Sequence, residues 1–114
     1  MAKNIIKAHG VGKLEIINAE NSRSFRELKG QTVEVTGAAL ITDTNKAGET
    51  VDFAYLFSKD GSVYGGNSAT IYRAVDGLID LMDEDAAKKY AATADGRSAA
   101  SGREFLSLRI SEVV

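Results

Sequence analysis

Hydrophobic and polar residues alternate along much of the first half of the chain, and this pattern predicts β-strands. Alternating segments, separated by polar or glycine-containing turns, cover residues 2–8, 13–18, 31–42 and 51–58. A tight turn at Asp60 and Gly61 leads from the last of them into another short strand. In the longest segment one face is formed by Val33, Val35, Gly37, Ala39 and Ile41. Glycine in the middle of a strand predicts a bend or a bulge there.

A helical period replaces the alternation between residues 67 and 83. The apolar residues are spaced by three and four and form a single stripe, made of Ile71, Ala74, Val75, Leu78, Ile79 and Met82. Asn67 or Ser68 is a suitable N-cap. A shorter helical turn is predicted at 24–28, where Ser24 and Glu27 match a capping box and Gly30 ends the turn.

The C-terminal part is less uniform. Residues 86–93 fit either an extension of the helix or a strand. Residues 94–102 are small and polar, which predicts a flexible loop, whereas 103–112 alternate and predict a final strand. In that strand Phe105 lies on one face, and Leu106, Leu108 and Ile110 lie on the other.

These elements predict a single, mainly β domain spanning residues 1–114. Three strands, a helix and further strands follow one another, and the first long strand is bent. This order is typical of a small five-stranded Greek-key barrel of the OB type, with one α-helix between strands three and four. A general α+β sheet with one helix packed across it is the alternative.

Aromatic residues gather in the middle of the chain. Five of the eight lie in the segment 53–72, namely Phe53, Tyr55, Phe57, Tyr64 and Tyr72. The first three alternate and point to one face, where they form either part of the core or a platform on which nucleobases stack. Asp52 and Ser58 occupy the opposite face, which favours the core. If Ala54 and Leu56 fill the barrel instead, the rings lie outside.

Composition excludes several kinds of chemistry. The chain has no cysteine and a single histidine, His9, so thiolate nucleophiles and cysteine metal sites are absent, and a histidine triad would require an oligomer. Asp76, Asp80 and Asp83 share one helix face that a divalent ion could occupy, but such stripes are usually solvated. We therefore expect no enzymatic activity, no cofactor and no metal. With no membrane-spanning run or signal-peptide core, a cytoplasmic location is expected.

Charge is distributed unevenly although the net charge is only −2. Residues 1–29 contain six Lys and Arg against three Glu, whereas residues 76–85 contain five acidic residues and no basic one. Such asymmetry predicts a basic side and an acidic side on one small domain. Ordinary solvated surfaces are the alternative explanation.

Four blocks of the sequence, 28–37, 55–64, 67–73 and 102–108, read LKGQTVEVTG, YLFSKDGSVY, NSATIYR and GREFLSL. Together they resemble the small single-stranded-DNA-binding proteins encoded by tailed bacteriophages, over about residues 25–110. The resemblance implies an OB-type barrel that coats single-stranded DNA during phage genome replication. Two departures are a loop 94–102 with one Arg and no Lys, and the absence of a long acidic tail.

The expected function is therefore binding of single-stranded DNA without sequence preference, with replication proteins as further partners. Bases would stack on Phe53, Tyr55, Phe57, Tyr64 and Tyr72, and phosphates would contact Lys29, Lys46, Lys59, Arg73, Arg97 and Arg103. The alternative is a protein-interaction module, for example a phage inhibitor of a host protein, acting through the aromatic edge and the acidic helix. The sequence leaves the oligomeric state open.

Overall fold

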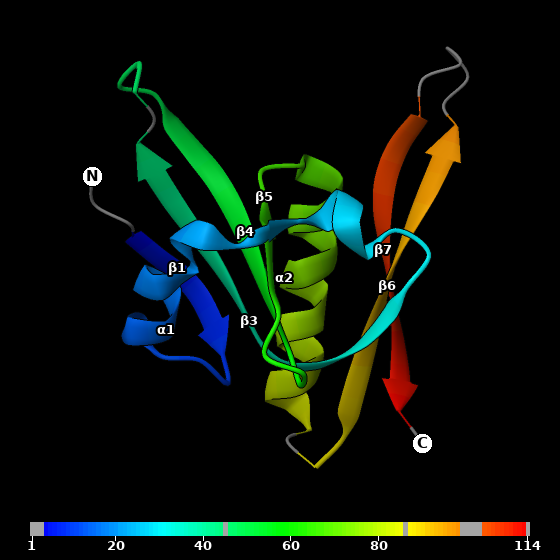
Figure 1. The fold of residues 1–114 in the computed structure, drawn as a ribbon. Coiled ribbons are helices and arrows are strands. Elements are labelled where there is room, and N and C mark those ends of the chain that lie inside the picture. The colour runs from blue at the N-terminus through cyan, green and yellow to red at the C-terminus, as the bar shows by residue number, and fades with distance from the viewer. Residues whose placement is uncertain (1–3, 45, 86, 99–103, 114) are drawn as a thin grey trace.

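The computed structural model describes residues 4–44, 46–85, 87–98 and 104–113, and within them a curled β-sheet wraps around one long helix (Figure 1). The seven strands of this part are β1 (Asn4–His9), β2 (Arg23–Ser24), β3 (Thr32–Thr44), β4 (Thr50–Ser58), β5 (Val63–Gly66), β6 (Lys89–Ser98) and β7 (Glu104–Val113). The helices are α1 (Lys13–Ile17), two 3₁₀ turns, η1 (Asn18–Asn21) and η2 (Phe25–Leu28), and the long α2 (Ala69–Glu84).

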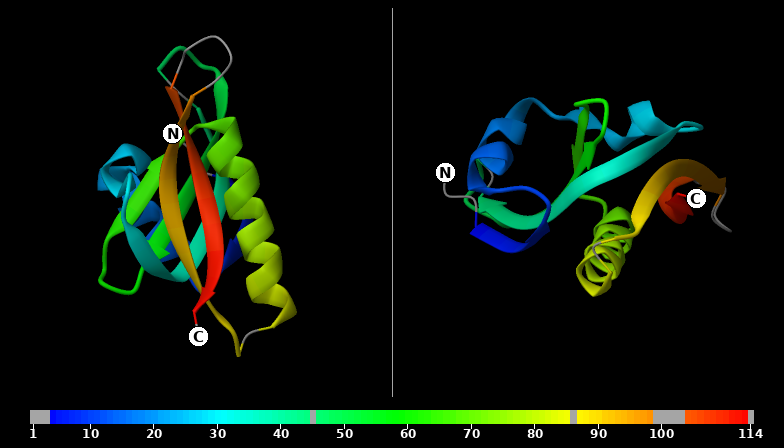
Figure 2. Two further views of the ribbon diagram at one scale, coloured as in Figure 1. Left: turned by 90° about the vertical axis from the view of Figure 1, so that its right-hand side faces the viewer. Right: turned by 90° about the horizontal axis from the view of Figure 1, so that it is seen from below.

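Strand β3 is the centre of the sheet. The strand order is β2-β5-β4-β3-β6-β7, and β1 pairs with β3 as well. β6 pairs with residues 32–35 of β3, and β1 pairs with residues 38–42. The β3–β4 and β6–β7 hairpins therefore diverge from a common base, and α2 lies between them (Figures 1 and 2).

A bulge in β3 divides the core into two parts. The register shifts between Val35 and Gly37, which confirms the irregularity predicted at this glycine. A Cβ atom on Gly37 would lie 2.6 Å from Cγ1 of Val11, so the close approach requires glycine. The extra residue also reverses the side-chain alternation. Val35 and Leu40 consequently face α2, whereas Ile41 faces the opposite side, and the prediction that one face runs along the whole strand was wrong.

The main hydrophobic core lies between the sheet and α2. It contains the buried stripe of the helix, Ile71, Val75, Leu78, Ile79 and Met82, as predicted from the spacing. Ser68 is the N-cap, and its Oγ accepts a hydrogen bond from the backbone N–H of Ile71. Leu108 of β7 is buried in this core, and Leu106 and Ile110 pack against it, which confirms the face predicted for the last strand.

Residues 23–30 cross the front of the molecule and connect β5 with β6 (Figure 1). β2 pairs in parallel with β5, and the backbone N–H of Gly30 donates to the carbonyl oxygen of Ala94 in β6 at 2.9 Å. Between these contacts η2 buries Phe25 and Leu28 in the main core. The capping box predicted for this turn is present. The backbone N–H of Ser24 donates to Oε2 of Glu27, and Oγ of Ser24 accepts a hydrogen bond from the backbone N–H of Arg26.

Three sequence-based expectations require correction. Residues 13–17 form helix α1 and not a strand, because the backbone N–H of Gly12 is capped by Glu15 and Ile16 alone is buried within α1. The loop predicted at 94–102 is wrong for residues 94–98, because these belong to β6 and pair with 104–108 of β7, and residues 99–102 lie outside the described part of the chain. The five-stranded barrel is too simple a description, since the described part of the chain has seven strands in one curled sheet.

Candidate nucleic-acid interface

Three of the five candidate stacking rings are buried. Tyr55, Phe57 and Tyr64 are only 4%, 8% and 4% exposed, whereas Phe53 and Tyr72 are half-buried. For Tyr55 and Phe57 the core alternative describes the position of the ring, and Tyr64 is buried as well, so the faces of these three rings are not accessible to bases in this structure. Phe53 and Tyr72 remain as candidates for stacking. Tyr72 belongs to α2 and packs against the main core, whereas Phe53 packs against the second cluster on the other face of the sheet.

Helix α1 and the following 3₁₀ turn cover the aromatic row. Ile16 and Ala19 pack against Tyr55 and Phe57 in the second hydrophobic cluster. Tyr55 also lies against Gly65, where a Cβ atom would come within 2.7 Å of the ring. The sequence contained no signal for this cover, because residues 13–18 alternate like a strand and their helical form depends on the packing of Ile16.

The candidate phosphate-binding cations are spread over several elements. Lys29, Lys46 and Arg73 are exposed, after η2, in the β3–β4 turn and in α2 respectively. Lys59, in the β4–β5 turn, has its Nζ 3.5 Å from Oε2 of Glu34. Arg97 belongs to β6, and Arg103 lies outside the described residues.

Two shallow cavities share Asn67, the residue just before the cap of α2. The first has a volume of about 310 Å³ and lies between η2, the end of β5 and β7; Arg26, Phe25, Gly66, Ile71 and Leu106 help to line it. The second, about 340 Å³, lies between β4 and α2 and is lined in part by Asp52, Tyr72 and Arg73. We call the two cavities together the Asn67 groove.

The Asn67 groove combines features that the sequence-based site did not combine. It brings Tyr72 and Arg73 into one lining with Asn67, and it adds Arg26, which was not among the predicted site residues. The excess of cations in residues 1–29 was the only sequence signal for Arg26. Burial is the main cause that raises the pKa of Tyr72, with Asp52 and Asp76 adding to it, so its hydroxyl remains protonated at neutral pH.

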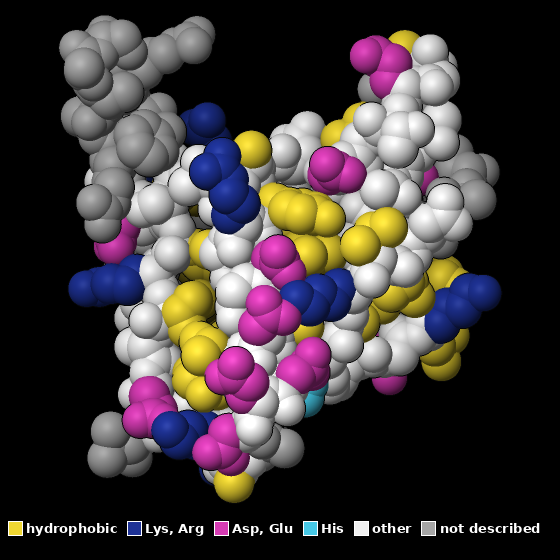
Figure 3. Space-filling model, turned by 180° about the vertical axis from the view of Figure 1, so that it is seen from behind, with side chains coloured by type: hydrophobic (Ala, Val, Ile, Leu, Met, Phe, Trp, Pro, Cys, Tyr) yellow, Lys and Arg dark blue, Asp and Glu magenta, His cyan; other side chains and the backbone are white. Residues whose placement is uncertain are grey.

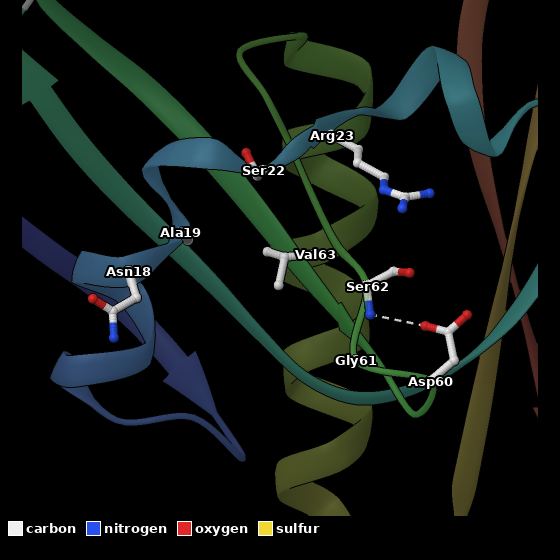
Figure 4. A pocket seen from close by; sticks show the side chains of 8 residues that line it. All are labelled: Asn18, Ala19, Ser22, Arg23, Asp60, Gly61, Ser62 and Val63. Carbon is white, nitrogen blue, oxygen red and sulfur yellow. Dashed lines mark hydrogen bonds between the residues drawn. The ribbon is translucent and has the colours of Figure 1, made fainter.

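A third cavity, of about 410 Å³, opens on the front of the molecule between η1, β2 and the β4–β5 turn (Figure 4). Arg23 and Asp60 are the charged residues of its lining. The backbone N–H of Ser62 donates to Oδ1 of Asp60 at 2.8 Å, and this bond is the main cause that lowers the pKa of Asp60. Asp60 is thus a turn-forming carboxylate, while Arg23 adds a further cation to the segment that crosses the front.

The outer face of α2 is acidic, and β1 is bound to it. Lys7 contacts Asp80 and lies 2.7 Å from Oδ1 of Asp76, and Nδ1 of His9 lies 2.6 Å from Oδ1 of Asp83. Acidic side chains gather over this side of the molecule (Figure 3). The stripe is therefore paired with β1 and is not merely solvated. Within the described residues no group of three or more His, Cys, Asp or Glu side chains could hold a metal ion.

Replacing Lys7 with methionine is expected to loosen β1 from α2, which native-state hydrogen exchange of residues 4–9 would detect as faster exchange. The hydrogen bonds to Asp76 and Asp80 raise the pKa of Lys7, so the lysine is charged at neutral pH and its contribution to these ion pairs is lost, as the pH rises, in strongly alkaline solution. Lys88→Met is the control, because Lys88 pairs with Glu112 at the far end of β7. Equal exchange in both variants would show that packing alone holds β1.

Comparison with known proteins decides the family. The family model described as phage single-stranded DNA-binding protein matches residues 3–111. The chain belongs to this family. It is 28% identical over 106 residues to the single-stranded DNA-binding protein of Bacillus phage PZA, across 88% of this chain and 86% of the relative. The corresponding protein of Bacillus phage phi29 is 27% identical over the same lengths. No solved structure matches the chain.

Membership in the phage single-stranded DNA-binding protein family agrees with the resemblance found in the sequence. Single-stranded DNA is the expected partner, and the family binds without being enzymatic, as expected from the composition. In the described part of the chain, no helix has the length and apolar character needed to cross a membrane.

Proposed function

We propose that the protein binds single-stranded DNA without sequence preference, and that the strand follows the Asn67 groove. One observation carries this proposal: Arg26 and Arg73 are exposed beside a groove that also contains the half-buried ring of Tyr72. Cations that neutralise phosphates and a ring that stacks on a base are the two components such binding requires. In the setting of phage replication in the host cytoplasm, this binding would protect the unpaired strand.

Phosphate contact is assigned first to Arg26 and Arg73. Each guanidinium has several donors in a planar arrangement that suits phosphate oxygens. Lys29 and Lys46 are exposed, and we include them as further phosphate contacts outside the groove. Arg97 and Arg103 stay in the proposal as the sequence predicts them; Arg97 belongs to β6, and Arg103 lies outside the described residues. Lys59 is the weakest candidate, because it already pairs with Glu34.

Base stacking is assigned to Tyr72. The structure buries Tyr55, Tyr64 and Tyr90, so Tyr72 is the tyrosine whose ring a base can approach without rearrangement. Phe53 is also half-buried, but it lies on the other face of β4 and contacts Tyr55 with ring centroids 5.8 Å apart. We therefore place it outside the main path of the strand.

Electrostatics favour the same side of the molecule. The outer face of α2 carries Asp76, Asp80 and Asp83, which would repel phosphates. Arg23, Arg26 and Lys29 lie instead on the segment that crosses the front. This separation of charge supports a strand path away from the acidic helix face, in a protein whose net charge is −2.

We also propose that the fold is a variant of the OB-type barrel. The elements β3, β4, β5, α2, β6 and β7 follow the order of three strands, a helix and two strands. The bulged strand β3 pairs with both β4 and β6. β7 does not pair with β5, and residues 23–30 instead connect β5 to β6. β1 and α1 would then be additions to the barrel.

Salt dependence tests the proposed DNA contacts. Arg26→Gln and Arg73→Gln are each expected to reduce the slope of log affinity against log salt concentration by about 0.7, because one phosphate contact on a single strand is lost. Titration of a dT oligonucleotide at several salt concentrations measures the slope. Lys88→Gln, far from the groove, should leave it unchanged.

Two results would count against the proposal. If the arginine variants keep the wild-type slope while Lys88→Gln changes it, the strand does not follow the Asn67 groove. If the wild-type protein does not bind oligonucleotides even at low salt, the protein-interaction alternative replaces DNA binding as the function.

A further inference from the structure

The cavity of about 410 Å³ on the front of the molecule lies outside the Asn67 groove (Figure 4). We call it the Arg23 cavity. Its volume is within the range of about 300–1,000 Å³ that is typical of small-molecule sites. The two sites are neighbours, because Arg23 lines the cavity and Ser24, the next residue of β2, lines the groove. A strand in the groove can therefore place a neighbouring nucleotide at the cavity.

Two opposite charges face the Arg23 cavity. The guanidinium group of Arg23 comes from β2 and the carboxylate of Asp60 from the β4–β5 turn, and both residues are exposed. The hydrogen bond from the backbone of Ser62 is the main cause that lowers the pKa of Asp60. The hydroxyl groups of Ser62 and Ser58 add to this effect, and Arg23 acts through its charge and not through a hydrogen bond. In the view of Figure 4 the hydroxyl of Ser62 lies between the two charged groups, so a ligand can meet all three.

The hydrogen-bonding properties of these groups determine which base the cavity suits. A guanidinium group only donates hydrogen bonds, an ionised carboxylate only accepts them, and a serine hydroxyl does both. Guanine presents two adjacent donors, N1–H and the N2 amino group, and two acceptors, O6 and N7, that suit an arginine. Thymine has a single ring N–H between two carbonyl oxygens, which a carboxylate repels. Adenine and cytosine offer one amino group each, so guanine makes the fullest use of both charges.

We propose that the Arg23 cavity binds a guanine base of the single strand. Asp60 accepts hydrogen bonds from N1–H and the N2 amino group, and Arg23 donates to O6 and N7. This inference rests on the proposed function, because the Asn67 groove holds the neighbouring nucleotides. Those nucleotides are bound through phosphate contacts and stacking, which tolerate any base. The preference for guanine is therefore confined to one position of the strand.

Base substitution in the strand tests this inference on the unaltered protein. The probes are dT oligonucleotides that hold one copy and carry a single dG at successive positions, titrated at one salt concentration. At one position dG is expected to raise the affinity by about fivefold or more over the all-dT strand, as for one bidentate pair. Deoxyinosine at that position lacks only the N2 amino group, so it should lose much of the gain. Adenine and cytosine there should each give a smaller gain than guanine.

Two variants locate the effect in the cavity. Asp60→Asn keeps an oxygen that can accept from the backbone N–H of Ser62, so the turn is retained, but its amide group opposes the donors of guanine. Arg23→Gln removes the guanidinium group. Both variants are expected to lose the gain from dG, whereas the control Lys88→Gln should keep it. Circular dichroism verifies that each variant is folded.

The outcomes separate this inference from the proposed function. Equal affinity for dG and dT at every position, in a wild-type protein that binds all these strands, would overturn the guanine site and leave DNA binding intact. A gain that survives in Asp60→Asn, or a larger gain from dC, would overturn it as well. Free dGMP that binds as tightly as the dG strand would assign the cavity to a free nucleotide instead of the strand. If no oligonucleotide is bound even at low salt, the proposed function itself has failed.

Discussion

Replacing Leu56 with alanine is expected to lower the free energy of unfolding by about 2–5 kcal/mol. Leu56 is fully buried in β4, and it faces the core that this strand shares with α2. Its neighbours come from rigid elements on both sides, the sheet and the helix, so they cannot collapse fully into the space that the side chain leaves. Loss of transfer free energy and an unfilled cavity therefore add together.

Urea denaturation followed by circular dichroism measures this loss. Leu81→Ala removes the same atoms from an exposed position on α2. It should therefore lower the free energy of unfolding by much less than Leu56→Ala does. The difference between the two leucines tests whether the core between β4 and α2 determines stability. Equal losses would mean that this core does not have the packing described here.

Replacing Tyr72 with alanine is expected to weaken binding of single-stranded DNA by about 1–3 kcal/mol, or roughly 5- to 150-fold. The ring is half-buried beside Arg73 in the Asn67 groove, so a base can stack on its accessible part while the arginine contacts a neighbouring phosphate. Alanine removes the π-face and leaves the cations in place. The loss should therefore appear in affinity and not in the salt slope.

Tyrosine fluorescence separates stacking from other effects of the substitution. Tyr72→Phe keeps a ring of the same shape, so it should retain most of the affinity and lose the emission change on adding poly(dT). Tyr90→Phe, at a buried position in β6, should retain both. An emission change that survives in Tyr72→Phe would place the stacked base on another tyrosine.

The sequence determined those features that depend on neighbouring residues. The apolar spacing and the serine cap define α2, and the pair Ser24 and Glu27 defines the turn η2. Gly37 marks the bulge, because only a residue without a side chain fits there. The family was also evident from short sequence blocks. For α2 and η2 the interactions lie within a few positions of one another along the chain, whereas at Gly37 the glycine itself is the local signal and its close neighbour, Val11, is distant in sequence.

Tertiary structure alone decided which surfaces are exposed. Alternation in β4 sets three rings on one face, but only the packing of Ile16 and Ala19 shows that two of them are covered. Likewise, Arg26 and Arg73 are far apart in sequence, and their place around one groove follows from the path of residues 23–30 across the sheet. Local patterns specify elements and their faces, whereas contacts between distant segments determine which face meets solvent, and binding depends on that exposure.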